Sequence, residues 1–145
     1  MRSGFLIAVC VCCSSAHAVL QADACMGIHG SMGSGMTDAM IEDFSLSEKQ
    51  FIVGETKMEI VEDVPVNYPL ADFYAKRDRA EEAIHFTSLN EIRSIYTEYH
   101  PRNIIVKFTY YNKRGKNNVF LTSYVINDYE CSIRFNGYII VKREF

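Results

Sequence analysis

The sequence predicts an α+β fold, in which helices pack on a curved four-stranded antiparallel meander. Two stretches, 69–84 and 88–100, place apolar residues three and four positions apart, which is the spacing of an amphipathic helix. From 104 to 144 the chain is instead rich in β-branched and aromatic residues, interrupted by polar turns. The 145 residues are 48% hydrophobic and 23% charged, a composition typical of one globular domain.

The first residues have the pattern of an export signal. A basic residue precedes an apolar run over 5–13, and Ala16-His17-Ala18 matches the small-x-small sequence that signal peptidase reads. We therefore expect 1–18 to be a signal peptide and the protein to be periplasmic or secreted. Cleavage after Ala24 is an alternative. An uncleaved signal or lipidation of Cys25 are the two alternatives that would place the protein on a membrane.

Removal of the signal peptide would leave Cys25 and Cys131 of the five cysteines. Two cysteines in an oxidising compartment favour a disulfide, and two buried free thiols are the alternative. Residues 19–36 contain repeated glycines and no sustained apolar period, which predicts a flexible Gly/Met-rich arm. The single α+β domain is then expected to cover 37–145.

Before the sheet, the sequence predicts a short helix, then an extended segment, and then two longer helices. The short helix is expected within 37–50, and the extended segment over 51–66. The first long helix covers 69–84. The second begins at Ser88-Leu89-Asn90-Glu91, a capping box in which each outer side chain bonds the backbone N–H of the other. Pro101 ends this helix, because the residue before a proline avoids helical geometry.

Four consecutive strands are predicted over 104–111, 119–126, 129–135 and 138–144. Asn136-Gly137 is a strong signal for a two-residue hairpin turn between the last two. Helices that precede such a meander pack on its face in α+β proteins. In outline, this order of elements resembles the cystatin-like group or the cone-shaped fold of the nuclear-transport-factor type.

The predicted arm contains a set of soft metal ligands. Met26, His29, Met32 and Met36 follow Cys25 closely, and thioether, thiol and imidazole groups are the ligands that Cu(I) selects. Copper binding or redox chemistry by the arm is therefore one hypothesis. The alternative is an arm without a ligand, whose methionines simply pack on an apolar face.

A second hypothesis is a pocket between the helices and the sheet. His85, Asp72 and Tyr74, together with tyrosines of the sheet, would supply groups for proton transfer or for holding a small molecule. The alternative is that His85 lies at a helix end and that the tyrosines belong to the core. The chain contains no Gly-x-Ser-x-Gly, no His-Glu-x-x-His and no phosphate-binding loop, which favours a binding protein over an enzyme.

The turn between the first two strands of the meander is basic. It contains Lys113, Arg114, Lys116 and Asn117, residues that suit an acidic partner surface. The formal net charge of −3 and the pI of about 5.8 argue against a nucleic-acid partner. Together these observations predict a small exported protein that binds another protein, as an inhibitor or an immunity-type protein would, without a required cofactor.

Overall fold

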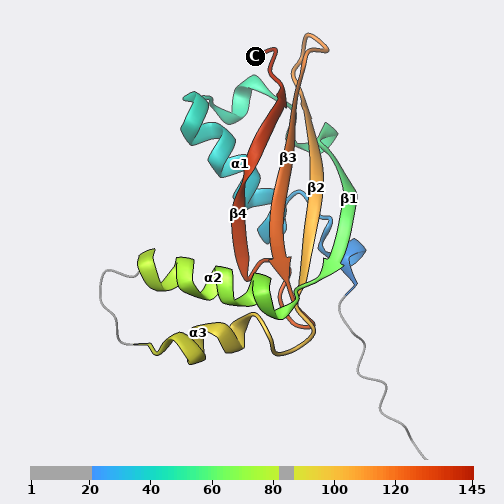
Figure 1. The fold of residues 1–145 in the computed structure, drawn as a ribbon. Helices are drawn as coiled ribbons and strands as arrows, with labels where there is room; N and C mark the ends of the chain where they lie inside the picture. The colour runs from blue at the N-terminus through green and yellow to red at the C-terminus, as the bar shows by residue number, and fades with distance from the viewer. Residues whose placement is uncertain (1–20, 82–86) are drawn as a thin grey trace, which may run out of the picture.

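The computed structural model describes residues 21–81 and 87–145, and the predicted signal peptide lies outside these ranges. The described chain forms a four-stranded sheet with α1 against one face and with α2 and α3 at one end of the other (Figure 1). The predicted α+β fold is confirmed. The helices are Ser31–Phe44 (α1), Tyr68–Glu81 (α2) and Leu89–Ile95 (α3); the 3-10 helices are Ala22–Cys25 (η1), Glu48–Gln50 (η2) and Val53–Glu55 (η3); and the strands are Lys57–Pro65 (β1), Arg102–Tyr111 (β2), Asn117–Ile126 (β3) and Arg134–Lys142 (β4).

The sheet is an antiparallel meander in the order β1-β2-β3-β4. Its first strand comes from the segment that the sequence predicted only as extended, because Met58 and Ile60 pair with Phe108 and Val106 of β2. The last two predicted strands are instead one strand, β4. The sheet therefore has the predicted number of strands, but their assignment along the chain is shifted.

The predicted hairpin at Asn136-Gly137 is wrong, because both residues lie inside β4. Phe135 pairs with Tyr124, and Tyr138 pairs with Thr122, so the pair 136–137 faces a single residue of β3 in a β-bulge. Gly137 has a φ of +99°, a conformation that glycine adopts at low cost. The local preference of Asn-Gly for positive φ is thus used in a bulge rather than in a turn.

Most of the segment that was predicted as the third strand, residues 129–133, forms a loop between β3 and β4, and only its last two residues belong to β4. The side chain of Asn127 accepts hydrogen bonds from the backbone N–H groups of Tyr129 and Glu130, at 2.9 and 2.8 Å. Cys131 in this loop forms the predicted disulfide with Cys25, across a Cα–Cα distance of 5.3 Å. The disulfide attaches η1 to the loop that leads into β4.

The structure corrects the expectation of a flexible arm over 19–36. η1 and the first turns of α1 occupy most of this segment, and α1 begins at Ser31, earlier than predicted. One face of α1 is fully buried on the sheet, where it joins aromatic and β-branched residues of β2 and β3. The members of this core with no exposed surface are Met32, Met36, Met40, Ile104, Val106, Phe108, Tyr110, Phe120, Tyr124 and Ile126.

Glycine makes the close packing at the start of α1 possible. A Cβ atom on Gly33 would lie only 2.2 Å from the backbone oxygen of Ile28. Further along the helix, Thr37 Oγ1 and the phenol oxygen of Tyr110 are 3.0 Å apart in a hydrogen bond between α1 and β2. The beginning of α1 is therefore fixed from both the preceding segment and the sheet.

α2 and α3 cover the lower end of the second sheet face in Figure 1. Their buried residues are Ala71, Tyr74, Ala75, Ile92 and Tyr96, which surround Val125 of β3. The predicted capping box at the start of α3 is present: Ser88 N donates to Glu91 Oε2 at 2.7 Å, and Glu91 N donates to Ser88 Oγ at 3.3 Å. No helix formed by residues 21–81 or 87–145 is both long and apolar enough to span a membrane.

Candidate functional site

The turn between β2 and β3 is held in one conformation by the side chain of Asn112. Its Oδ1 accepts hydrogen bonds from the backbone N–H of Arg114, at 2.9 Å, and of Lys116, at 3.1 Å. Gly115 adopts a φ of +72°, which completes the tight turn. The side chains of Lys113, Arg114 and Lys116 are consequently exposed on an ordered backbone.

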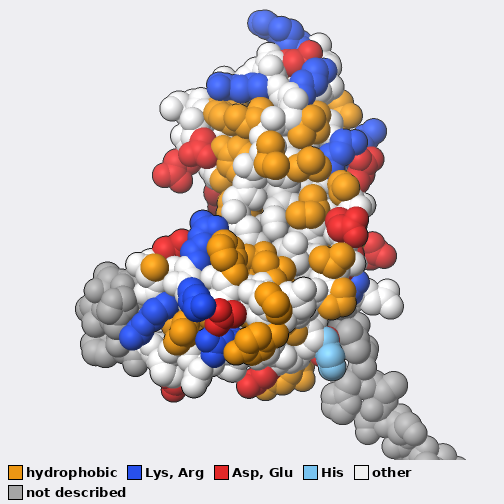
Figure 2. All heavy atoms as spheres, in the orientation of Figure 1, with side chains coloured by type: hydrophobic (Ala, Val, Ile, Leu, Met, Phe, Trp, Pro, Cys, Tyr) orange, Lys and Arg blue, Asp and Glu red, His pale blue; other side chains and the backbone are white. Residues whose placement is uncertain are grey.

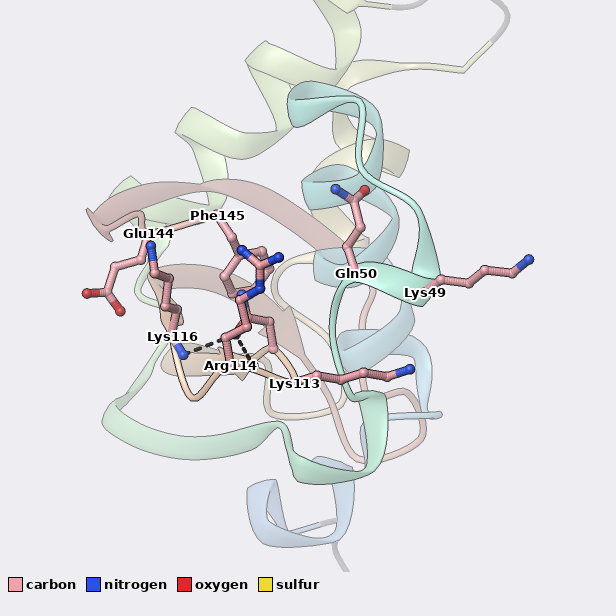
Figure 3. Close-up of a pocket in the computed structure, with 8 residues that line it drawn as sticks. Lys49, Gln50, Lys113, Arg114, Lys116, Glu144 and Phe145 are labelled. Carbon is pink, nitrogen blue, oxygen red and sulfur yellow. Dashed lines mark hydrogen bonds between the residues drawn. The ribbon is translucent and has the colours of Figure 1, made fainter.

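A fourth cation joins these three from a different part of the chain. Lys49 in η2 lines the same cleft, which has a volume of about 380 Å³. Figure 3 shows Lys49 and Lys113 extending toward the same side of the cleft. We name Lys49, Lys113, Arg114 and Lys116 the basic tip. The cleft is lined by Lys49, Gln50, Asn112, Lys113, Arg114, Lys116, Glu144 and Phe145.

The basic tip carries more positive charge than the carboxylate of its cleft can balance, although Lys116 interacts with Glu144 electrostatically. None of its four side chains forms an ion pair with a carboxylate of residues 21–81 or 87–145. Glu144, the acidic residue of the cleft, accepts a hydrogen bond from Asn117 N at 2.7 Å and pairs with Lys142 at 3.2 Å. These contacts lower the pKa of Glu144, with the Asn117 bond as the largest cause. The cleft therefore carries an excess of positive charge.

Asn118, which the sequence analysis did not single out, holds Glu144 and Phe145, two residues that line the cleft. This fully buried side chain donates from Nδ2 to the carbonyl oxygen of Phe145 at 2.9 Å, and its Oδ1 accepts from Glu144 N at 2.8 Å. Asn117, a predicted binding residue, is half-buried, and its backbone N–H donates to the carboxylate of Glu144. Neighbouring asparagines thus have different roles.

Tyr74, a predicted catalytic residue, lies in a polar network between α2 and the sheet. Its phenol donates to Asn103 Oδ1 at 3.1 Å and accepts from Asn136 Nδ2 at 3.1 Å. Asn136 Nδ2 also donates to Ser123 Oγ at 2.9 Å. Burial raises the pKa of Tyr74, so the phenol stays protonated at neutral pH. These contacts suit a residue that attaches α2 to the sheet.

Asp72 lies among different partners, and the structure does not join it to the network of Tyr74. Its carboxylate pairs with Lys76 Nζ at 2.6 Å on α2 and with Arg93 Nη2 at 2.6 Å on α3. Hydrogen bonds from Lys76 and then Arg93 lower the pKa of Asp72. The third predicted residue, His85, lies outside the described residues.

The sequence analysis also missed Arg134, the centre of the attachment of α2. Its nearly buried side chain pairs with Asp78 of α2, lies 5.5 Å from the ring centroid of Tyr74, and donates to Asn136 Oδ1 at 2.8 Å. Tyr96, which directly follows α3, donates to the same Asp78. Because these residues are far apart in sequence, no local pattern could have identified the cluster.

The predicted copper ligands lie in different environments, with Met26 only partly buried against the core. Met32 and Met36 are fully buried in the core, whereas His29 is exposed. Cys25 is bonded to Cys131, so it has no thiolate to offer. Across residues 21–81 and 87–145, no group of three or more His, Cys, Asp or Glu side chains is placed to hold a metal ion. The methionine spacing is explained by the helical period of α1.

A second exposed surface lies on the sheet face that α1 leaves free. Five apolar residues of β2, β3 and β4 form what we call the open strip: Ile105, Val119, Leu121, Ile139 and Val141. Ile139 is 68% exposed and Val141 57%. Leu121 pairs directly with Ile139, and Ile105 lies on the neighbouring strand, two residues from the partner of Leu121. Figure 2 shows hydrophobic side chains gathered over the sheet on this side.

The chain was compared with protein-family models, curated proteins and solved structures, and no match was found in any of the three.

Proposed function

We propose that this protein is an exported binding protein whose basic tip holds an acidic surface of a partner protein, as an inhibitor or immunity-type protein would. The observation that carries the proposal is that Lys49 lines the same cleft as Lys113, Arg114 and Lys116, and that none of the four forms an ion pair with a described carboxylate. Four cations from two separate segments meet around one cleft, so the fold, and not only one turn, concentrates the charge.

The energetics of such a surface suit protein recognition. A single exposed ion pair contributes about 0–1 kcal/mol, but a cluster of like charges also accelerates encounter with an opposite surface. The turn is already ordered by Asn112, so binding does not have to order its backbone. We expect binding whose association rate falls steeply as salt is added.

The disulfide between Cys25 and Cys131 supports the exported location. Such bonds persist in oxidising compartments and are rare in the reducing cytosol. The bond is compatible with an extracellular location, and the predicted signal peptide is the reason for preferring the periplasm or the medium.

A charge-neutralising variant tests the function of the basic tip. The probe is an oligo-glutamate peptide, whose binding is measured by fluorescence anisotropy at low and at physiological salt. The variant carries Lys113→Gln, Arg114→Gln and Lys116→Gln. Its control carries Lys57→Gln, Lys76→Gln and Arg77→Gln, which remove the same charge elsewhere.

We expect the control to bind like the wild type and the tip variant to bind about tenfold more weakly or worse. Equal affinity of the two variants would mean that net charge, and not the basic tip, determines binding. The proposal would then be wrong.

A further inference from the structure

We infer that the open strip is the second half of the same interface and that it receives an amphipathic helix of the partner, with acidic residues at the end near the basic tip. This inference rests on the proposed function and adds the shape and chemistry of the partner. The two surfaces are continuous: Val119 pairs with Lys142, and it follows Lys116 and Asn117 closely in the chain. A partner that contacts one surface is therefore within reach of the other.

The helical layer on this sheet face is incomplete. α2 covers only the end where Val125 and Arg134 are buried, and it leaves Ile139 and Val141 more than half exposed. A helix that packed on the open strip would lie in the same layer as α2, at the usual distance from a sheet. The vacant area therefore continues the layer that α2 occupies (Figure 1).

The edge of β4 argues against an extended strand as the occupant. Bulges occur at the pair 136–137 and again near Val141, so the regular part of the edge is limited to Tyr138, Ile139 and Ile140. Bulges on an edge strand interrupt the hydrogen-bonding pattern that an added strand needs. The continuous surface that β4 offers to a partner therefore consists of side chains on its open face. It does not consist of backbone groups along its edge.

The open strip ends in a cavity that would accept a large apolar side chain. The cavity has a volume of about 230 Å³ and lies where Ile105, Leu121 and Ile139 meet the Asn136-Gly137 bulge. From this cavity to Val119 the strip covers about four residues of β3, or roughly 13 Å. That length corresponds to between two and three turns of a helix. The partner helix would insert one apolar side chain at the cavity and place its acidic end at the basic tip.

Charge separates the two ends of this surface. The upper end carries the basic tip, whose cations form no ion pair with a described carboxylate, whereas Arg134 at the lower end is paired with Asp78. Along the β2 side, Lys107 is paired with Glu59 at 2.7 Å. Among the described residues of this surface, the cations without an ion pair gather at the basic tip, which gives the partner helix a defined direction.

Three synthetic helical peptides test the inference on the oxidised protein. The first has leucines on one face and glutamates at one end; the second keeps the glutamates but replaces the leucines with glutamine; and the third keeps the leucines but replaces the glutamates with glutamine. Affinity is measured by fluorescence anisotropy, and the contact surface by changes in amide NMR shifts. The protein variants are Ile139→Asp, the conservative Ile139→Leu, and Val61→Asp as a control of equal charge on the exposed part of β1.

We expect the first peptide to bind best and to shift the amides of β3, β4 and the turn. Ile139→Asp should weaken its binding about tenfold or more, while Ile139→Leu and Val61→Asp should retain it. Thermal unfolding of each variant shows that the fold is kept, since Ile139 is largely exposed.

The inference is overturned if Ile139→Asp binds the first peptide as well as Val61→Asp does, or if the peptide stays extended on the edge of β4. If the first and second peptides bind equally well through the basic tip, the open strip does not contribute to binding. The inference is then wrong, and the proposed function is unaffected. If no peptide binds to any of the proteins, both the inference and the proposed function are wrong. A wild-type dimer that Ile139→Asp converts to a monomer would assign the strip to a second copy of this chain and would also overturn the inference.

Discussion

The phenol of Tyr124 donates a hydrogen bond of 2.6 Å to the backbone carbonyl oxygen of Met32, which lies 92 residues earlier in the chain. Both side chains are fully buried, and the bond joins the last part of β3 to the first turn of α1. Burial raises the pKa of Tyr124 well above its ordinary value, so the phenol remains a donor even in alkaline solution. This contact is one reason that α1 starts where it does.

Replacing Tyr124 with phenylalanine should therefore destabilise the fold. The Tyr124→Phe variant loses one buried hydrogen bond and keeps the ring, so we expect the free energy of unfolding to fall by about 1–2 kcal/mol. Urea unfolding followed by circular dichroism measures the change. Tyr129→Phe is the control, because that tyrosine is 69% exposed, and its effect should stay within about 0.5 kcal/mol. Equal effects in the two variants would contradict the role of the Tyr124 bond.

Two glycines of α1 should respond in opposite ways to alanine. In Gly33→Ala the new Cβ would lie 2.2 Å from the backbone oxygen of Ile28, so we expect a loss of about 2–3 kcal/mol as the segment moves away. In Gly35→Ala the nearest atom is the phenol oxygen of Tyr124 at 3.7 Å, and the higher helix propensity of alanine should be neutral or stabilising by up to about 1 kcal/mol. Thermal unfolding of the two variants gives the comparison. A stable Gly33→Ala variant would show that the contact with Ile28 is dispensable.

The disulfide should contribute strongly to stability. Cys25 and Cys131 are 106 residues apart in sequence, and a crosslink over such a loop stabilises by about 4–5 kcal/mol in the chain-entropy description. We expect the Cys25→Ala, Cys131→Ala double variant to unfold at much lower urea than the oxidised wild type. Wild-type protein treated with a reductant should fall between the two or match the variant. No shift after reduction, with the free thiols verified by mass, would contradict the prediction.

The sequence predicted the fold class because the strongest patterns are local. The capping box at Ser88 and the alternation in β2 and β3 depend on near neighbours, and both are present in the structure. The start of α1 was missed because Gly33 and Gly35 resemble a flexible linker, whereas Gly33 allows close packing against Ile28. The Asn136-Gly137 pair was misassigned because positive φ suits a turn and a bulge equally, and only pairing with β3 distinguishes them.

The sequence predicted the part of the candidate site that lies in one turn, and it missed the parts that other segments contribute. Lys113, Arg114 and Lys116 are adjacent in sequence, so their charge could be read directly. Lys49 reaches the cleft through tertiary structure, and no spacing in the chain connects it with the turn. Asn118 follows the turn directly, but its bond to Phe145 depends on how the end of the chain packs beside β3. The open strip was also hidden, because its exposure depends on where α2 ends above the sheet.

The carboxylate of Asp72 should make stability depend on pH in the acidic range. Its pKa in the folded protein is lowered by Lys76 and then by Arg93, from an ordinary value of 3.8. A group whose pKa is lower in the folded state adds stability above the unfolded pKa, and this contribution is lost as the pH falls through the folded pKa. We therefore expect Asp72→Asn to unfold at lower urea than the wild type at pH 7. The difference between the two proteins should shrink below about pH 4. Urea midpoints measured from pH 7 to pH 2 provide the test, with Asp23→Asn as an exposed control. A difference between wild type and Asp72→Asn that stays constant down to pH 2 would mean that the charge of Asp72 does not hold α2 to α3.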